Sequence, residues 1–441
     1  MNKKNTPKVS VGLDIGTTTI GAAVLEPGSG QVLKTFTLPN DAAVPSEHAW
    51  EHLQDPVRIL EKAAALLDGI CDAWPVSSVG VTGQMHGILF TGADGSPLSP
   101  LYTWQDTRAG RGENSACERI RRETRYRVPE GYGLATLYHL LLEGRLPPGT
   151  AGCCTVMDFV TMKLCRLPHP VTHITNAASW GFYREDTHGF DAGALRKLGI
   201  PCGILPAVTA EGRIIGEYRG IPVAAAIGDS QAAFIGSVED PAHTVLVNIG
   251  TGSQVSMLSD RPLEEESPQA ESRPFDGKRY MLSASCLCGG RAYALLASFF
   301  GQYAAALGLP DGPRYDVLNR LAAEGLEQGN VLPVRTTFCG TRADPALRGQ
   351  ITGIGEENLT PAALAAGVLC GMADELYGLY RKMPSDGVTV LTASGNAVRK
   401  NPVLQRILAE KFGLPLQLPP RTEEAACGAA IFAARAAGST A

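Results

Sequence analysis

The sequence lacks several features that would place it in a specialised class of protein. It has no run of about 18 apolar residues that would span a bilayer, and its start, MNKKNTPK, leads into residues too polar for a secretion signal. None of its 11 cysteines belongs to a C-x-x-C pair, which argues against a structural zinc site. We therefore expect a cytoplasmic protein with free thiols and no membrane partner.

A charge bias toward polyanionic partners is also missing. The chain carries 39 Lys and Arg against 44 Asp and Glu, a net charge of -5, so we expect no general attraction to nucleic acid. Hydrophobic residues at 44% and charged residues at 19% are typical of a folded globular protein. The length of 441 residues suits two domains better than one core.

The two best-known nucleotide motifs are absent as well. The chain contains no G-x-x-x-x-G-K-[ST] sequence and no strand-associated G-x-G-x-x-G. A nucleotide, if one binds, must therefore be held by another arrangement.

The order of hydrophobic patterns predicts a mixed α/β domain at the start of the chain. Alternating apolar residues predict a first strand that ends at Asp14, and further strands at 20–25, 31–38 and 76–81. The strand that ends at Asp14 and the strands at 20–25 and 31–38 form an antiparallel meander. A helix opened by Asp55-Pro56 precedes the fourth strand.

An internal echo indicates a duplicated architecture. VGLDIGTTTIGAAVL, which starts at Val11, and VLVNIGTGSQVSML, which starts at Val245, share the plan strand, Asp or Asn, Ile-Gly-Thr, strand. Chance resemblance of two hairpins is the alternative. We expect two lobes of similar topology that face one another across a cleft, residues 1–240 and residues 241–441.

Turns of glycine and hydroxyl residues are candidate phosphate sites. Small or hydroxylated residues let backbone N–H groups approach an anion closely. Gly16-Thr17-Thr18-Thr19 and Gly250-Thr251-Gly252-Ser253 meet this need, and Gly395-Asn396 after a strand is a third candidate. Each alone also fits a hairpin turn without a ligand.

Two aspartates stand where charge would serve phosphoryl transfer. Asp14 precedes the first of these turns, a placement suited to Mg²⁺ beside a phosphate, whereas its counterpart Asn248 is neutral. Asp229, between Gly228 and Ser230, fits a base that accepts a hydroxyl proton. Capping of a local turn remains open for Asp14, and helix N-capping for Asp229.

Three further segments supply amides, an imidazole, a carboxylate and indoles. These are Gln84-Met85-His86, Trp104-Gln105-Asp106, and Asn176 with Trp180. Such a mixture suits a polyhydroxylated ligand, although an ordinary structural role for His86 stays open. His48 and His52 have helical spacing for a metal, but no third ligand is in view, so a solvated face is favoured.

Taken together, these motifs resemble those of the FGGY carbohydrate kinases. The segments that carry the resemblance occur in the right order over nearly the whole chain: LDIGTTT (13–19), VTGQMHG (81–87), IGDSQAA (227–233), NIGTGSQVS (248–256), ASGN (393–396) and EEAACGAA (423–430). Within that family, TWQD (103–106) and NAASWG (176–181) look most like sedoheptulokinases.

The resemblance implies an actin-like ATPase fold whose two lobes of ribonuclease-H-like topology close on ATP, Mg²⁺ and a sugar. It also implies that residues 1–240 form the sugar-binding lobe and residues 241–441 the nucleotide-binding lobe. Asp229 matches the catalytic base of the family, and Asp14 matches its metal-associated acid. The remaining matches are Thr17, Thr18, Gly250, Thr251 and Gly252 for phosphates, Gly395 and Asn396 for adenosine, and Gln84, Met85, His86, Trp104 and Asp106 for the sugar.

The implied activity is transfer of the γ-phosphoryl group of ATP to a terminal hydroxyl of a ketose, with sedoheptulose favoured. Two departures bear on this expectation, because the chain is short for the family and Thr107 stands where similar sedoheptulokinases tend to have Gly. The alternatives are a xylulokinase or another sugar or polyol kinase, a nucleotide-driven conformational protein of the same fold, and an inactive sugar sensor. The sequence leaves the oligomeric state open and allows a homodimer.

Overall fold

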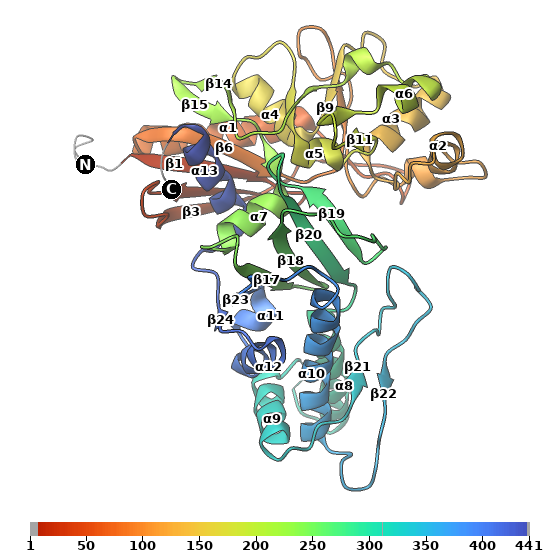
Figure 1. Ribbon diagram of the computed structural model, residues 1–441, viewed down its shortest axis with the longest axis vertical. Coiled ribbons are helices and arrows are strands. Elements are labelled where there is room, and N and C mark those ends of the chain that lie inside the picture. The colour runs from red at the N-terminus through yellow and green to blue at the C-terminus, as the bar shows by residue number, and fades with distance from the viewer. Residues whose placement is uncertain (1–7, 311, 439–441) are drawn as a thin grey trace. The chain divides into compact units, whose positions relative to one another are not determined.

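The computed structural model describes residues 8–310 and 312–438. They divide into two compact units (Figure 1): unit 1 comprises Met1–Gly236, Pro274–Lys278 and Arg421–Ala441, and unit 2 comprises Ser237–Arg273 and Arg279–Pro420. Unit 1 thus takes in the end of the chain, which the division predicted at 240/241 assigns to the second lobe.

The central sheet of unit 1 contains the predicted meander. Its strand order is β14-β15-β6-β1-β2-β3, and β16 pairs with β6. β1 pairs with β2 and β2 with β3 in antiparallel fashion, whereas β1, β15 and β16 each run parallel to β6. The bounds are β1 Val9–Ile15, β2 Thr19–Leu25, β3 Val32–Pro39, β6 Val76–Gly83, β14 Ile214–Tyr218, β15 Ile221–Ala224 and β16 Ile227–Gly228.

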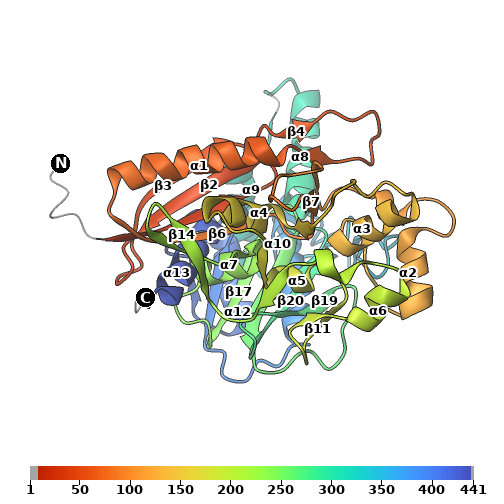
Figure 2. The ribbon, with the colours of Figure 1, turned by 90° about the horizontal axis from the view of Figure 1, so that it is seen from above.

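Helices cover both faces of this sheet. α1 (Pro56–Ala73) begins where the Asp55 side chain accepts hydrogen bonds from two backbone N–H groups, as the sequence predicted. It packs with α4 (Val156–Leu164) on the apolar side chains of β1 and β6. α7 (Asp229–Ser237) and α13 (Glu424–Ala436) form a second core that includes residues of β2 and β16. Figure 2 shows α1 along one side of the sheet and α13 on the other.

Glycines let α13 lie directly on the sheet. A Cβ at Gly12 would stand 1.8 Å from the backbone oxygen of Ala426, and one at Gly80 would stand 2.0 Å from that of Ala429. Gly12 and Gly80 are register partners on β1 and β6. The small residues at these positions therefore let the backbone of α13 lie against the strands.

The remaining elements of unit 1 lie mostly between β6 and β14. They build a separate apolar cluster around Phe90, Trp180 and Phe182. Their bounds are β4 Ala43–Val44, β5 Leu53–Gln54, β7 Leu89–Thr91, β8 Leu101–Tyr102, η2 Arg108–Gly110, α2 Ala116–Thr124, α3 Gly133–Leu142, β9 Gly152–Cys154, β10 Val171–His173, α5 Ile174–Ala178, β11 Tyr183–Arg184, β12 Gly189–Phe190, α6 Ala192–Lys197, η3 Cys202–Ile204 and β13 Ala207–Thr209.

Unit 2 repeats the strand plan of unit 1. Its sheet has the order β19-β20-β18-β17-β23-β24, in which β20, β18 and β17 are antiparallel and β17 runs parallel to β23. β3-β2-β1-β6 follows the same plan, so the duplication predicted from the echo is confirmed. The bounds are β17 Thr244–Ile249, β18 Ser253–Ser259, β19 Ala270–Pro274, β20 Tyr280–Cys286, β21 Val334–Arg335, β22 Gln350–Ile351, β23 Val390–Ser394 and β24 Leu416–Gln417.

One helix of unit 2 is unusually apolar. α10 (Pro361–Tyr380) has the length and composition of a membrane span, which the sequence reading did not anticipate, yet 67% of that window is buried inside the structure. Its side chains belong to the main core of unit 2, so it is a core helix. The others are α8 Gly290–Ala306, α9 Tyr315–Glu327, α11 Asn396–Arg399 and α12 Pro402–Phe412.

The contact between α13 and the sheet gives a stability prediction. Gly12→Ala should lower the free energy of unfolding by about 2 kcal/mol or more, because the new methyl group overlaps a backbone that cannot retreat without moving α13. Gly69→Ala is the matched control, since Gly69 is exposed in α1 with nothing within 4 Å, and it should stabilise by about 0.5–1 kcal/mol. Urea denaturation measures both, and equal effects would contradict the packing argument.

Candidate functional site

Three loops of unit 1 leave neighbouring parallel strands at the same edge of the sheet. Ile15 of β1 and Gly228 of β16 are both register partners of Gly83, the last residue of β6. The loop after β1 begins at Gly16, the loop after β6 begins at Gln84, and α7 begins at Asp229. The carboxyl edge of a parallel sheet is where ligands bind in open α/β folds, so the topology gathers the predicted residues there.

Asp14 lies among other carboxylates at this edge. Burial, followed by the charges of Asp229 and Glu423, raises the pKa of Asp14 from its ordinary value of 3.8 to about 7. Asp229 is the first residue of α7, and the Ser230 hydroxyl donates to its Oδ1 over 3.2 Å. The structure therefore brings together the two acids that the sequence singled out.

Glu423 is a third acid that sequence reasoning did not assign to this site. It has a left-handed backbone with φ of 57° immediately before α13. Its Oε1 accepts a hydrogen bond of 2.9 Å from Thr37 Oγ1, and a Cβ at Gly21 would stand 3.1 Å from its Oε2. Two features of the sequence could have drawn attention to it: its place at the head of EEAACGAA, and the glycine in the facing strand.

These oxygens are chemically suited to Mg²⁺. Carboxylates are hard ligands, and a divalent cation would favour the charged form of Asp14, which burial and the neighbouring acids disfavour. Among the described residues, no three His, Cys, Asp or Glu side chains stand close enough to enclose a metal ion by themselves. This agrees with the habit of Mg²⁺, which keeps waters and takes phosphate oxygens besides one or two carboxylates.

The raised pKa of Asp14 predicts a pH dependence of stability. The folded protein holds this proton more tightly than the unfolded chain, so the stabilisation is present at low pH and is lost as the pH rises through about 7. Asp14→Asn should therefore match wild type near about pH 4 and exceed it in Tm by an amount that grows up to about pH 8, without Mg²⁺ or nucleotide.

Asp94→Asn provides a control of opposite sign. Asp94 is exposed, and hydrogen bonds from Ser96 lower its pKa, so its stabilisation is lost as the pH falls. Thermal unfolding from pH 4 to 8 measures both variants against wild type. A difference for Asp14→Asn that does not change with pH would contradict the interpretation.

A hydrogen-bonded network connects the turn after β1, a candidate phosphate site, with the loop after β6, a candidate sugar site. The Thr17 hydroxyl donates to Gln84 Oε1 over 3.4 Å and accepts from Trp104 Nε1 over 3.0 Å. Gln84 Nε2 donates to Gln54 Oε1 over 2.7 Å, and Gln54 Nε2 donates to the Thr17 backbone oxygen over 2.8 Å. Thr18 beside it is exposed. Gln54 is a member that the sequence did not reveal, because it lies on the short strand β5.

Trp104 presents the largest open apolar surface of this network. Its side chain is 48% exposed, although its indole N–H is engaged by Thr17. Gln84 is almost fully buried, so much of its amide serves the network. An indole face with fixed polar neighbours is the kind of wall that a polyhydroxylated ligand uses.

Met85 and His86 have different surroundings. Met85 is buried against β16, where a Cβ at Gly228 would stand 2.7 Å from its Sδ. His86 adopts a left-handed backbone with φ of 74°, and its ring stacks on Tyr132 at 4.4 Å. Its Nδ1 lies 2.9 Å from the backbone oxygen of Ser179, which requires a proton on that nitrogen. Met85 thus supports the strand before Asp229, and His86 is held in one orientation.

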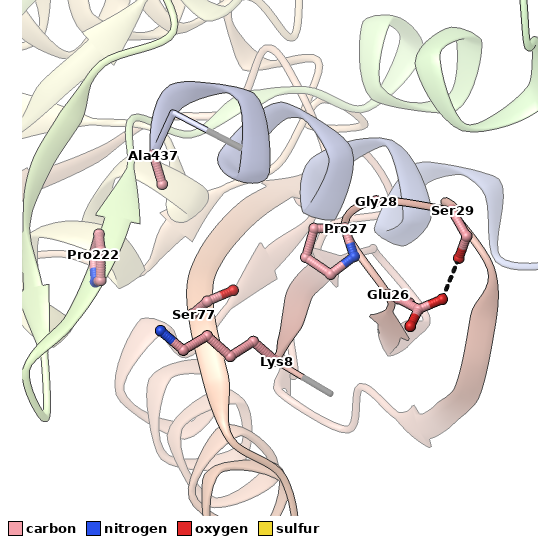
Figure 3. Close-up of a pocket in the computed structure, with 8 residues that line it drawn as sticks. All are labelled: Lys8, Glu26, Pro27, Gly28, Ser29, Ser77, Pro222 and Ala437. Atoms are coloured by element: carbon pink, nitrogen blue, oxygen red, sulfur yellow. Dashed lines mark hydrogen bonds between the residues drawn. The ribbon is translucent and has the colours of Figure 1, made fainter. Parts of the chain in front are cut away.

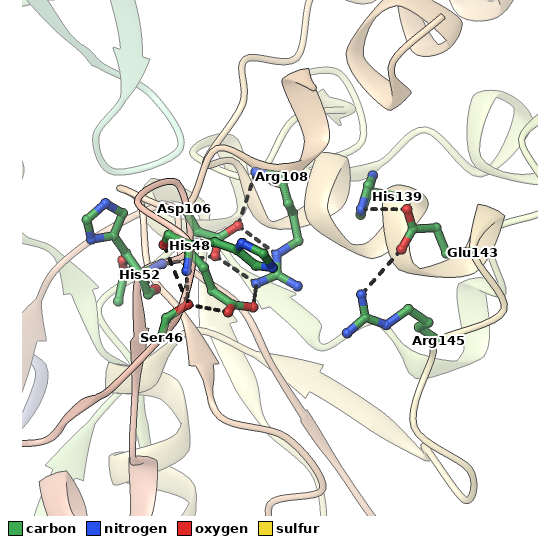
Figure 4. A network of polar contacts seen from close by, with 10 residues as sticks. Ser46, His48, His52, Asp106, Arg108, His139, Glu143 and Arg145 are labelled. Carbon is green, nitrogen blue, oxygen red and sulfur yellow. Dashed lines mark hydrogen bonds and ion pairs between the residues drawn. The ribbon is translucent and has the colours of Figure 1, made fainter. Parts of the chain in front are cut away.

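Asp106 lies inside the protein, in an ion pair (Figure 4). It is fully buried, and Arg108 Nε donates to its Oδ1 over 2.7 Å. Arg108 also pairs with Glu51 at 2.8 Å and lies 4.3 Å from the centre of the Tyr102 ring. The Asp106 Oδ2 accepts from the backbone N–H of His52. In this geometry Asp106 holds the loop that carries Trp104, and its role as a sugar contact stays a prediction.

Removal of Asp106 should therefore cost stability. Asp106→Ala leaves the buried Arg108 with Glu51 alone, and we expect a loss of about 3 kcal/mol in the free energy of unfolding. Asp186→Ala removes an exposed partner of Arg184 and should cost less than about 1 kcal/mol. Denaturant titration of both variants is the measurement. Full stability of Asp106→Ala, with only a weaker sugar affinity, would instead show that Asp106 acts as an open contact.

Unit 2 contains a pocket of about 750 Å³ at the turn between β17 and β18. Gly250, Thr251, Gly395 and Asn396 line it, and Gly252 completes the turn. Gly395 requires glycine, since its φ is 94° and a Cβ would stand 2.3 Å from the Ile249 oxygen. All the unit 2 residues predicted for nucleotide binding thus lie in or beside one concave site.

Aromatic and basic side chains complete this pocket. Tyr293 and Tyr315 stack with ring centres 6.1 Å apart, and Tyr293 donates to Asn319 Oδ1 over 3.0 Å. Arg291 and Lys400 supply positive charge to the lining. Stacking walls suit a purine, and cations suit phosphates. Sequence reasoning missed these residues, which come from helices far apart in the chain.

Another hollow of about 690 Å³ contains none of the predicted residues (Figure 3). Lys8, Ser77 and Pro222 line it, and Glu26 accepts a hydrogen bond from Ser29 within it.

Asn176 and Trp180, which the sequence placed among candidate sugar contacts, are buried, and their N–H groups donate to backbone oxygens.

Comparison with known families decides what the two units are. The N-terminal domain of the FGGY family of carbohydrate kinases matches residues 9–246, and the C-terminal domain matches residues 245–437. The chain belongs to the FGGY family of carbohydrate kinases. Its fold is the duplicated, actin-like α/β fold of that family.

Relatives and solved structures agree with this assignment. Sedoheptulokinase from Mus musculus is 28% identical over 466 residues, 96% of each chain, and that from Homo sapiens is 28% identical over 472 residues, 97% of each. Xylulose kinase from Rhodospirillum rubrum has a TM-score of 0.80 at 20% identity, covering 98% of this chain and 91% of that one. Plasmodium falciparum glycerol kinase with ADP has a TM-score of 0.77 at 17% identity, covering 98% and 90%.

This FGGY protein is an ATP-dependent sugar kinase. Its substrate is accordingly a small sugar molecule. A nucleotide-driven conformational protein without a small acceptor, which the sequence left open, does not fit membership in a carbohydrate kinase family.

Proposed function

We propose that this kinase transfers the γ-phosphoryl group of ATP to a terminal hydroxyl of a ketose, with sedoheptulose favoured. The observation that supports this substrate is the similarity to two sedoheptulokinases over nearly the full length of each chain. TWQD and NAASWG point the same way, because these are the two segments that look most like those of sedoheptulokinases.

Asp229 acts as the catalytic base in this proposal. Its carboxylate begins α7, where the helix dipole favours negative charge, and Ser230 donates to one of its oxygens. The other carboxylate oxygen would accept the proton of the attacking hydroxyl as the bond to phosphorus forms. Gln84, Met85, His86, Trp104 and Asp106 would form or support the sugar site around it.

Each unit offers groups that suit the phosphates. Thr17 and Thr18 in unit 1, and Gly250, Thr251 and Gly252 in unit 2, present hydroxyl or backbone N–H groups that suit phosphate oxygens. Gly395 and Asn396 would contact adenosine in the pocket that Tyr293 and Tyr315 line. Mg²⁺, when bound near Asp14, would neutralise charge on the phosphates, and Asp14 with Glu423 would supply the negative charge that holds it.

A terminal hydroxyl is a primary alcohol, so positioning carries most of the catalysis. A base within hydrogen-bonding reach, a fixed sugar and a neutralised triphosphate together remove the entropic and electrostatic costs of transfer. Xylulose and glycerol are the alternative acceptors, since solved xylulose kinases share the fold and several bacterial glycerol kinases are 25–29% identical.

A substrate panel tests the proposal. Sedoheptulose, xylulose, gluconate and glycerol are compared by kcat/KM with MgATP, and we expect sedoheptulose to have the highest value.

Asp229→Asn should lower kcat by about 10²–10⁴ while nucleotide affinity stays near wild type, because the base acts on the hydroxyl and not on ATP.

Asp240→Asn is the matched control for the catalytic variant. Asp240 is an exposed carboxylate that pairs with His243, so its loss should leave kcat unchanged. Preference for glycerol over every ketose would overturn the substrate proposal. Activity of Asp229→Asn within about threefold of wild type would overturn the role of Asp229.

Two further expectations belong to the proposal. All 11 cysteines are free thiols, which supports a reducing compartment such as the cytoplasm. For a homodimer, α8 offers a candidate surface, because Leu295, Phe299 and Tyr303 follow one another at helical spacing and are 47%, 62% and 65% exposed.

A further inference from the structure

Residues 175–180 contact both the strand before Asp229 and the loop after β6. This segment comprises most of α5 and the two residues that follow it. Thr175, Asn176 and Trp180 are all at most 2% exposed. Buried polar groups of this kind need fixed partners, and the identity of those partners indicates what the segment does.

At one end, the segment holds the backbone that leads into Asp229. Asn176 Nδ2 donates to the Ala226 backbone oxygen over 3.0 Å, and the Gly228 backbone N–H donates to Thr175 Oγ1 over 3.0 Å. Thr82 Oγ1 donates to the Ile227 oxygen between them over 2.8 Å. Three consecutive residues before Asp229 are therefore held by side chains as well as by the sheet.

This support matters because the strand itself is short. β16 contains two residues and pairs with β6 only through them. A two-residue ladder fixes few backbone angles, and each residue that is left unfixed gains conformational entropy. Side-chain hydrogen bonds to residues 226–228 compensate for the missing length.

Thr175 is itself held by His173. The His173 Nδ1 lies 3.0 Å from Thr175 Oγ1 and accepts from the Thr175 backbone N–H over 3.4 Å. Since the Thr175 oxygen accepts from Gly228, its own proton is directed to His173 Nδ1. Burial lowers the pKa of His173 to about 4, so the ring is the neutral acceptor that this arrangement needs.

At the other end, the segment holds the predicted sugar loop. Trp180 Nε1 donates to the Gly87 backbone oxygen over 3.0 Å, and the Ser179 oxygen accepts from His86 Nδ1 over 2.9 Å. The Ser179 hydroxyl donates to the Asn176 backbone oxygen over 2.8 Å, and this hydrogen bond connects the two ends of the segment. A segment six residues long thus joins β16, the strand before Asp229, to the loop that carries His86.

We propose that residues 175–180 form a bracket that fixes the distance and orientation between Asp229 and the loop of residues 84–87. Thr175 and Asn176 are positioning residues for the base, and Trp180 is a positioning residue for the sugar loop. The kinetic consequence rests on the proposed function, whereas the structural one does not. The two ends have separable effects, because one carries the reacting carboxylate and the other carries a sugar contact.

Thr175→Val tests the base end. Valine keeps the shape of threonine and removes the oxygen that accepts from Gly228. We expect kcat to fall about tenfold or more, because a displaced base loses near-attack geometry, with KM for ketose and for ATP within about threefold of wild type. Thr175→Ser restores the oxygen and should return kcat to within about twofold.

Trp180→Phe tests the sugar end. It removes the donor to Gly87 and keeps most of the ring, so KM for the ketose should rise about fivefold or more, with kcat within about twofold. Thr161→Val is the matched control, since Thr161 is a buried threonine of α4 whose hydroxyl bonds only oxygens of its own helix. It should change neither parameter beyond about twofold.

Hydrogen exchange measured by mass spectrometry separates the bracket from the proposed function. Thr175→Val should speed exchange in a peptide that covers residues 226–229, and Trp180→Phe should speed it over residues 85–88, while residues 19–25 stay protected in both. If no sugar is phosphorylated, the proposed function fails and hydrogen exchange still decides the bracket.

The proposal is overturned if Thr175→Val exchanges like Thr161→Val over residues 226–229. The proposal is also overturned if Thr175→Val and Trp180→Phe change kcat by the same factor and KM for the ketose by the same factor. Should Thr175→Val fail to fold, Trp180→Phe still tests the proposal, because exchange at wild-type rates over residues 85–88 in that variant would refute the connection.

Discussion

Two parallel ladders, β1 beside β6 and β6 beside β16, are the constraint on which the functional geometry of unit 1 depends. Because Gly83 is the register partner of both Ile15 and Gly228, the chain leaves three strands at one level of the sheet. Asp14, Gln84 and Asp229 then come from segments more than 60 residues apart without any of them requiring a long loop. Parallel pairing puts carboxyl ends together, and that is what makes this edge a site.

The close approach of α13 provides the rest of the site in unit 1. Gly12 and Gly80 have no side chain at the two positions where α13 comes nearest to β1 and β6, so the helix backbone lies directly against these strands. The residue just before this helix, Glu423, is thereby brought to Asp14 although the two are more than 400 residues apart. Burial, followed by the charges of Asp229 and Glu423, raises the pKa of Asp14, and this concentration of acids suits a cation.

Support and contact are divided among the polar residues of the site. Gln84 and Asp106 are buried and bonded within the protein, whereas Trp104 exposes about half of its side chain. A kinase that positions a sugar needs both kinds of residue, since a contact is only as precise as the groups that hold it. The bracket of residues 175–180 extends the same principle to the proposed base. Thr175 and Asn176 bond the backbone before Asp229, and Ser179 and Trp180 bond the loop after β6.

The sequence by itself determined the strands of the meander, the duplicated hairpin, the turns at Gly16 and Gly250, and the acids Asp14 and Asp229. These features depend on hydrophobic period and on turn chemistry, which are local properties of the chain. Only the tertiary structure decided that Asp106 is paired and buried, that Glu423 joins Asp14, and that Tyr293 and Tyr315 line the pocket of unit 2. Burial and convergence arise from contacts between distant segments, and no local pattern records them.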